Sequence, residues 1–183
     1  SDREDNFRRR ILPTYKANRK GQKPLCYWKL VAWMEQEGET YTRPSLEADD
    51  CIGILSSMEK NKDQCIILSG DKDMRTLAGW HYDFLRDIYE YITEEEADKN
   101  FFKQTLTGDP VDGYSGCPKI GAVNAARILD KDCSWNAVVA AFEKQGLTEH
   151  DALIQARVAR ILRASDYDFK KKEVKLWTPS TNS

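Results

Sequence analysis

The sequence predicts an α/β fold in which a central, mostly parallel sheet is flanked by helices and followed by a helical C-terminal part. Two observations carry this prediction. Short apolar runs of strand type alternate with helical periodicity up to residue 92, and only helical patterns follow. The chain has 183 residues, of which 40% are hydrophobic, enough to bury the core of one domain or of one domain with a small appendage.

Each expected element rests on a local signal. The apolar run Cys65–Leu68 is bounded by polar residues and is typical of a buried parallel strand, while residues 87–92 alternate and predict a second strand. Thr93 and Glu96 form a capping-box pattern that opens a helix to about residue 106. The other expected elements are a basic loop or arch over 1–24, helices over 25–37, 46–60 (capped by Ser45), 74–78, 122–129, 134–143 and 149–164, and a short strand over 40–43.

Charge is distributed unevenly, although the net charge is only −2. Lys and Arg outnumber Asp and Glu by nine to three over residues 1–29, and the acids dominate by seven to one over residues 83–98, which predicts a basic surface beside an acidic one. Five cysteines without a C-x-x-C pair indicate a reduced, cytoplasmic setting, and two isolated histidines argue against zinc. No signal peptide and no apolar run of membrane length is present, so we expect no membrane partner.

Seven carboxylates gather in three short runs at the ends of predicted elements. Such carboxylates are costly unless they are neutralised, and Mg²⁺ prefers carboxylate and water oxygens. The pattern is typical of a two-metal site for phosphodiester cleavage. Each run alone also has an ordinary explanation, as acids at a helix N-terminus, an Asp-Pro turn or a solvated Gly-Asp turn. The seven are Glu47, Asp49, Asp50, Asp71, Asp73, Asp109 and Asp112.

Two further segments indicate nucleic acid. The turn Gly116–Gly121 leads into a helix, where backbone N–H groups can hold a phosphate without distinguishing bases. The segments Phe7–Arg10 and Tyr15–Lys20 interleave cations with aromatic rings, which suits single-stranded nucleic acid. A plain helix connector and a disordered basic arm are the alternatives.

Taken together, the order and spacing of these segments resemble the structure-specific 5′-nucleases. This family includes flap endonucleases, phage 5′→3′ exonucleases and the 5′-nuclease domain of bacterial DNA polymerase I, and the phage exonucleases are most similar. The resemblance covers about residues 2–130 and implies a PIN-like 5′-nuclease fold whose helical part carries a helix-three-turn-helix. The matching residues are Phe7-Arg8, Tyr15-Lys16-Ala17-Asn18-Arg19, Glu47-Ala48-Asp49-Asp50, Gly70-Asp71-Lys72-Asp73, Gly108-Asp109 with Asp112, and Gly116, Pro118, Ile120 and Gly121.

The resemblance implies a metal-dependent 5′→3′ exonuclease or flap endonuclease that hydrolyses DNA, and RNA primers, beside replication proteins. It implies two Mg²⁺ ions, for which Mn²⁺ can substitute, and K⁺ at the helix-three-turn-helix. The implied metal ligands are Asp2, Glu47, Asp49, Asp50, Asp71, Asp73, Asp109 and Asp112, and all but Asp2 are also implied as catalytic, together with Lys16 and Arg19. The implied DNA contacts are Arg8, Tyr15, Lys16, Arg19, Lys72, Gly116, Lys119, Ile120 and Gly121.

The same resemblance implies a catalytic region over residues 1–106 with an arch at 7–24, a DNA-binding region over 107–177 and a disordered tail over 178–183. Gly113-Tyr114 stands where many relatives have Asn-Ile. The family's first strand and its metal-binding aspartate would precede residue 1, so we expect an N-terminally truncated member. The alternative function is therefore a DNA-junction binding module with weak or no catalysis. A PIN-like ribonuclease is a third hypothesis, against which the glycine turn counts.

Overall fold

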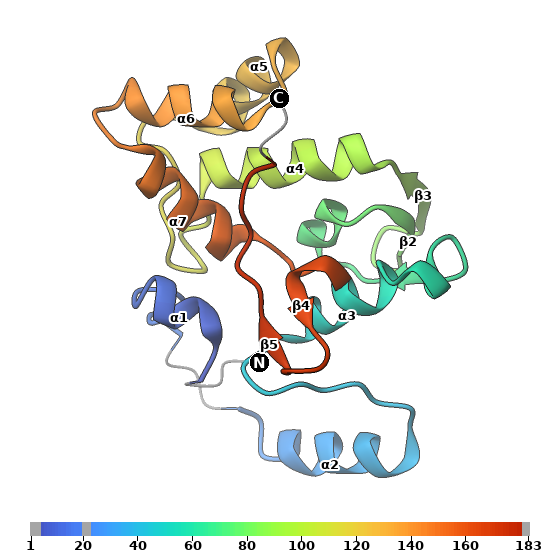
Figure 1. Ribbon diagram of the computed structural model, residues 1–183. Coiled ribbons are helices and arrows are strands. Elements are labelled where there is room, and N and C mark those ends of the chain that lie inside the picture. Colours follow the sequence, from blue (N-terminus) through green and yellow to red (C-terminus); the bar gives the residue numbers. More distant parts are fainter. Residues whose placement is uncertain (1–4, 20–22, 181–183) are drawn as a thin grey trace.

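The computed structural model describes residues 5–19 and 23–180. Figure 1 shows how the elements are arranged along the chain. The α-helices are α1 (Phe7–Ile11), α2 (Tyr27–Glu37), α3 (Ala48–Ser56), α4 (Glu94–Thr107), α5 (Ala122–Lys131), α6 (Trp135–Glu143) and α7 (Glu149–Ala159). The strands are β1 (Ile66–Leu68), β2 (Gly79–Asp83), β3 (Ile88–Ile92), β4 (Tyr167–Asp168) and β5 (Glu173–Val174). Three 3-10 turns are η1 (Glu59–Asn61), η2 (Lys72–Thr76) and η3 (Ala164–Asp166).

A small mixed sheet forms the β part of the fold, with strand order β1-β2-β3. β1 runs parallel to β2, whereas β2 and β3 are antiparallel. The predicted mostly parallel sheet is therefore wrong for the described residues. The reason is β2, which periodicity did not indicate: only four residues connect it to β3, and so short a connection permits only an antiparallel neighbour.

Several predicted boundaries also change. No strand forms over 40–43. Ser45 does not cap α3, because its backbone is left-handed (φ 63°) and Glu47 is the N-cap instead. The predicted helix over 74–78 is the 3-10 turn η2, and β1 is buried on one side only, since Ile66 and Leu68 are exposed.

The helix after β3 begins as predicted. The Glu96 backbone N–H donates to Thr93 Oγ1 (3.1 Å), and the Thr93 N–H donates to Glu96 Oε2 (2.9 Å). α4 then runs between the sheet and the C-terminal helices (Figure 1) and ends at Gly108, whose φ is 64°. The loop after Gly108 carries Asp109 and Asp112, so α4 fixes where these carboxylates lie.

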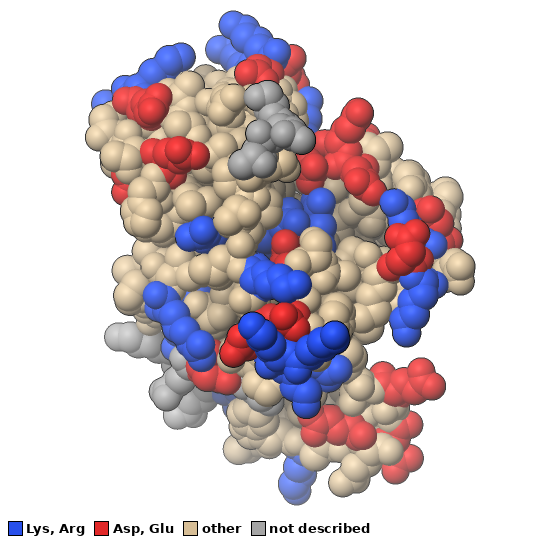
Figure 2. Space-filling model, viewed as in Figure 1, with Lys and Arg blue, Asp and Glu red and all other residues tan. Residues whose placement is uncertain are grey.

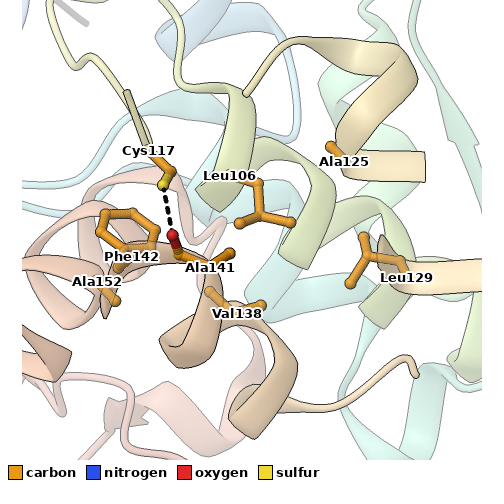
Figure 3. Close-up of a cluster of buried hydrophobic side chains, with 8 residues drawn as sticks. All are labelled: Leu106, Cys117, Ala125, Leu129, Val138, Ala141, Phe142 and Ala152. Carbon is orange, nitrogen blue, oxygen red and sulfur yellow. Dashed lines mark hydrogen bonds between the residues drawn. The ribbon is translucent and has the colours of Figure 1, made fainter. Parts of the chain in front are cut away.

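A hydrophobic core joins this loop to the C-terminal helices. Leu106 and Cys117 pack with Val138 and Phe142, all at most 2% exposed (Figure 3). The Cys117 thiol also donates a hydrogen bond to the carbonyl of Ala141 (3.4 Å), drawn as the dashed line in Figure 3. Both ends of the loop between α4 and α5 are thereby anchored.

The N-terminal segment is fixed between two other cores. Phe7 packs with Leu46 and Tyr167, and Tyr15 packs with Phe101 and Tyr114. α1 therefore contacts α7 and brings the basic segment against the body of the protein. By contrast, α2 has no buried residue and lies apart in Figure 1.

Among the helices of the described residues, none combines the length and apolar character that a bilayer crossing requires.

Candidate functional site

Arg8 is the central cation of the site, and it is buried. Its Nη1 and Nη2 donate to the two oxygens of Asp50 at 2.8 and 2.6 Å, and its Nε donates to the carbonyl of Val158 at 2.9 Å. Burial by itself lowers the pKa of Arg8, but the charges of Asp50 and Glu47 outweigh it and raise the pKa. Arg8 therefore stays charged and ties α1 to α3 and to the end of α7.

Asp50 has no lone pair left for another partner. Besides Arg8, its Oδ1 accepts from the Leu162 N–H (3.2 Å) and its Oδ2 from the Glu47 N–H (3.0 Å). The side chain is 0% exposed. Four accepted hydrogen bonds saturate a carboxylate.

Glu47 lies beside Asp50 and faces the basic segment. Its Oε1 accepts from Lys16 Nζ at 2.6 Å, and its Oε2 accepts from the Tyr15 hydroxyl at 2.7 Å. Burial opposes ionisation of Glu47, but Arg8 and Lys16 outweigh it and lower the pKa of the carboxyl. Glu47 is thus held as a carboxylate.

Lys16 joins Glu47 to the loop after α4. Its Nζ lies 3.6 Å from Asp112 Oδ2, and Arg19 Nη2 pairs with Asp112 Oδ1 at 2.5 Å. The Lys16 N–H also donates to the Asp112 carbonyl (2.7 Å). Acids and cations from three distant parts of the sequence therefore meet here.

Asp71 and Asp73 form the next part of the site, but not as an extended pair. Asp71 caps η2, with its Oδ1 accepting from the Asp73 N–H (2.9 Å). Asp73 Oδ1 accepts from Gln104 Nε2 of α4 at 2.6 Å. Burial, then Asp71 and more weakly Asp109 and Asp112, raises the pKa of Asp73 to about 6.

Asp49 completes the acidic surface from the α3 side. Burial raises its pKa, as do the charges of Asp71 and Glu47. Carboxylates from α3, η2 and the loop after α4 therefore lie within electrostatic reach of one another, which is the donor chemistry that divalent cations relieve. Over residues 5–19 and 23–180, however, no three His, Cys, Asp or Glu side chains already converge as a coordination site.

Some predicted contacts are corrected by these positions. Arg8 and Tyr15 are 2% and 3% exposed and face inward, so neither is available to nucleic acid. Asp109 serves its own turn, where its Oδ1 accepts from the Val111 N–H (2.8 Å). Asp2 lies outside the described residues. The roles of the other predicted ligands and cations stay predictions.

The glycine turn between α4 and α5 is fixed from both sides. Gly116 has φ 64°, and its N–H donates to Gln155 Oε1 of α7 (2.8 Å). Ile120 packs against the helical core, whereas Lys119 and Gly121 are exposed at the start of α5. Lys72 is likewise exposed.

Two glutamines in the site have no signal in the sequence. Gln104 positions Asp73, and Gln155 positions Gly116. Both lie inside helices, and no motif or spacing distinguishes them from solvated helix residues.

Comparison with known proteins bears on this arrangement. A family model described as "5'-3' exonuclease, N-terminal resolvase-like domain" matches residues 1–105. The "Exonuclease" of Escherichia phage T7 is 31% identical over 214 residues, covering 95% of this chain and 71% of that protein. The "Flap endonuclease Xni" of Colwellia psychrerythraea is 30% identical over 201 residues, covering 97% and 69%.

Solved structures agree in fold. The phage T5 flap endonuclease, crystallised with DNA and metal ions, superposes with a TM-score of 0.67 at 17% identity, over 85% of this chain and 70% of that one. The T5 5′-exonuclease with bound zinc gives 0.66 at 18% identity, over 84% and 69%. The predicted resemblance is confirmed: this chain belongs to the 5′-3′ exonuclease family of nucleases.

Proposed function

We propose that this protein is a divalent-metal-dependent 5′→3′ exonuclease and flap endonuclease that hydrolyses phosphodiester bonds of DNA. One observation carries the proposal. Lys16 lies between Glu47 (2.6 Å) and Asp112 (3.6 Å), next to carboxylates whose pKa values burial and mutual repulsion raise. Cations and acids gathered in this way suit a phosphate and the metal ions that neutralise it.

We assign Glu47, Asp49, Asp71, Asp73, Asp109 and Asp112 as the described residues that would hold Mg²⁺ or Mn²⁺. When bound, such ions stabilise negative charge on a reacting phosphate. Asp50 leaves this set, because its oxygens are saturated. Its role is to hold Arg8 and the start of α3, and so to place Glu47 and Asp49.

The cations have distinct tasks in this proposal. Arg19 is exposed and can meet the backbone of an incoming strand, whereas Lys16 is 8% exposed and reaches the site from within. Both ammonium and guanidinium groups stabilise the charge that develops on the transferred phosphate. Tyr15 and Lys16 keep Glu47 oriented and ionised.

The turn Gly116–Gly121 is our candidate for the duplex contact, as the helix-three-turn-helix that the resemblance implies. Its exposed Lys119 and the N-terminus of α5 favour phosphate, and this contact distinguishes no bases. Lys72 extends the basic surface near Asp71. Carbonyls of the same turn are where we place K⁺.

Cleavage of a 5′-labelled flap duplex tests the proposal. We expect cutting near the junction in Mg²⁺ or Mn²⁺, none in EDTA, and binding without cutting in Ca²⁺. Asp71→Asn should lower the cleavage rate at least about a hundredfold with binding unchanged, because it removes a charge aimed at the metals. Asp63→Asn, an exposed aspartate outside the cluster, is the matched control. A fully active Asp71→Asn would refute the metal assignment.

A DNA-junction binding module is the alternative. Tight binding to the flap duplex with no cutting in either metal would favour it. A matched substrate with an RNA 5′ strand measures whether RNA–DNA hybrids are also cut.

A further inference from the structure

The β4–β5 hairpin holds three consecutive lysines at its tip, and nothing proposed above uses them. Tyr167 pairs with Val174 and Asp168 with Glu173, so residues 169–172 form the turn. Asp168 Oδ1 accepts from the N–H groups of Lys170 (2.9 Å) and Lys171 (3.0 Å). These bonds lower the pKa of Asp168 and fix the turn backbone.

The lysine charges at this tip are not neutralised by the rest of the described chain. Lys170, Lys171 and Lys172 are exposed, and none takes part in an ion pair formed within the described residues. The one carboxylate inside the turn, Asp168, is occupied by backbone N–H groups. Figure 2 shows Lys and Arg side chains gathered over this hairpin. The tip is therefore a concentrated positive charge facing solvent.

An aromatic ring stands beside these charges. Phe169 is 45% exposed and is oriented by an edge-on contact with the buried Tyr167 ring, at 5.3 Å between centroids. An apolar ring held at the surface next to three ammonium groups offers a base one face to stack on and its phosphates several cations to bind.

The hairpin also lies against the basic N-terminal helix. Lys172 and Arg10 line one hollow of about 420 Å³, together with Phe7 and Val174. Arg10 is exposed, while its neighbour Arg8 points into the site. The positive surface of the hairpin thus continues onto the helix that carries the catalytic cations' segment.

We propose that Phe169–Lys172 is a contact surface for single-stranded nucleic acid, separate from the cleavage site and from the glycine turn. It rests on the proposed function, since its ligand is the unpaired 5′ strand of the same substrate. Single-stranded rather than duplex nucleic acid is the occupant because only unpaired bases can stack on Phe169.

The test compares binding of a single-stranded oligonucleotide with binding of a blunt duplex of the same length, in Ca²⁺ and at several salt concentrations. The variants are Lys170→Ala/Lys171→Ala and, separately, Phe169→Ala. Lys60→Ala/Lys144→Ala makes the same change in net charge at exposed sites elsewhere. Lys172 is left in place because its backbone is left-handed (φ 58°).

For the hairpin lysine variant we expect a salt dependence of single-strand binding that is shallower by about 1.4, or roughly 0.7 per lost phosphate contact. For Phe169→Ala we expect roughly tenfold weaker single-strand binding. Duplex binding and thermal unfolding midpoints should match the parent, as should the control variant throughout. Unchanged single-strand binding, or an equal loss on duplex, would overturn the proposal.

Cleavage of the flap duplex by the parent is measured alongside. If the parent cuts and the hairpin variants bind like it, the hairpin inference fails alone. If the parent neither binds nor cuts, the proposed function fails first.

Discussion

Asp73 shows how one side chain records the crowding of the acidic site. Its pKa rises from 3.8 to about 6 through burial and the charge of Asp71, and Gln104 fixes its orientation. Between these two values the folded protein binds more protons at this group than the unfolded chain does. Stability is therefore lost as the pH rises through this window.

Asp73→Asn should remove that loss. In EDTA we expect the variant to be more stable than the parent at pH 7 by about 1 kcal/mol, a shift of this size being discounted because the side chain is partly exposed. The difference should shrink toward pH 4, where the carboxyl is protonated in both states. Urea unfolding at both pH values measures it. A variant equally stable at pH 7, or less stable, would show that the carboxylate is not strained in the free protein.

At the level of elements, the connection between α4 and α5 depends on two close backbone approaches. A Cβ atom at Gly116 would lie 2.3 Å from the Gly108 nitrogen, and Gly116 already has φ 64°. Gly121 differs: its φ is −90°, and an added Cβ meets no atom within 4 Å. The first glycine is needed by the fold, and the second leaves open space at the surface.

Substitutions at these glycines should therefore separate folding from binding. Gly116→Ala should destabilise the protein by about 2–4 kcal/mol. Gly121→Val should change stability by less than about 1 kcal/mol, yet weaken duplex binding and make its salt dependence shallower. Chemical unfolding and duplex titrations at several salt concentrations measure both effects. If Gly121→Val binds duplex like the parent, the turn is only a connector.

Across the whole molecule, Arg8 joins segments that are far apart in sequence. It contacts Asp50 at the start of α3 and the carbonyls of Val158 and Arg160 near the end of α7. Removing it would leave Asp50 buried and charged without its partner. Both halves of the chain depend on this one guanidinium.

Arg8→Met should cost about 3–5 kcal/mol, as expected when one partner of a buried ion pair is lost. Arg10→Met, on the exposed side of the same helix, should cost less than about 0.5 kcal/mol. Denaturant unfolding followed by far-UV circular dichroism and tryptophan fluorescence measures both. We expect the two probes to coincide in the parent. Separate transitions would favour independent regions on either side of residue 106, and similar costs for both variants would contradict the role of Arg8.

Local signals determined much of this protein from its sequence alone. The capping box at Thr93 and Glu96 and the helical spacing of α4 to α7 operate over a few residues, so they survive without knowledge of the fold. The linear runs of acids and glycines identified the family in the same way. Residue type at short spacing is sufficient for such features.

Only the tertiary structure decided which of these side chains face the site. Arg8 and Tyr15 matched a nucleic-acid pattern and are buried, Asp50 matched a metal ligand and is saturated by Arg8, and Gln104 matched nothing yet holds Asp73. β2 likewise forms because β1 and β3 flank it. Burial and hydrogen-bond saturation depend on partners more than thirty or a hundred residues away, and these are brought together by packing rather than by sequence proximity.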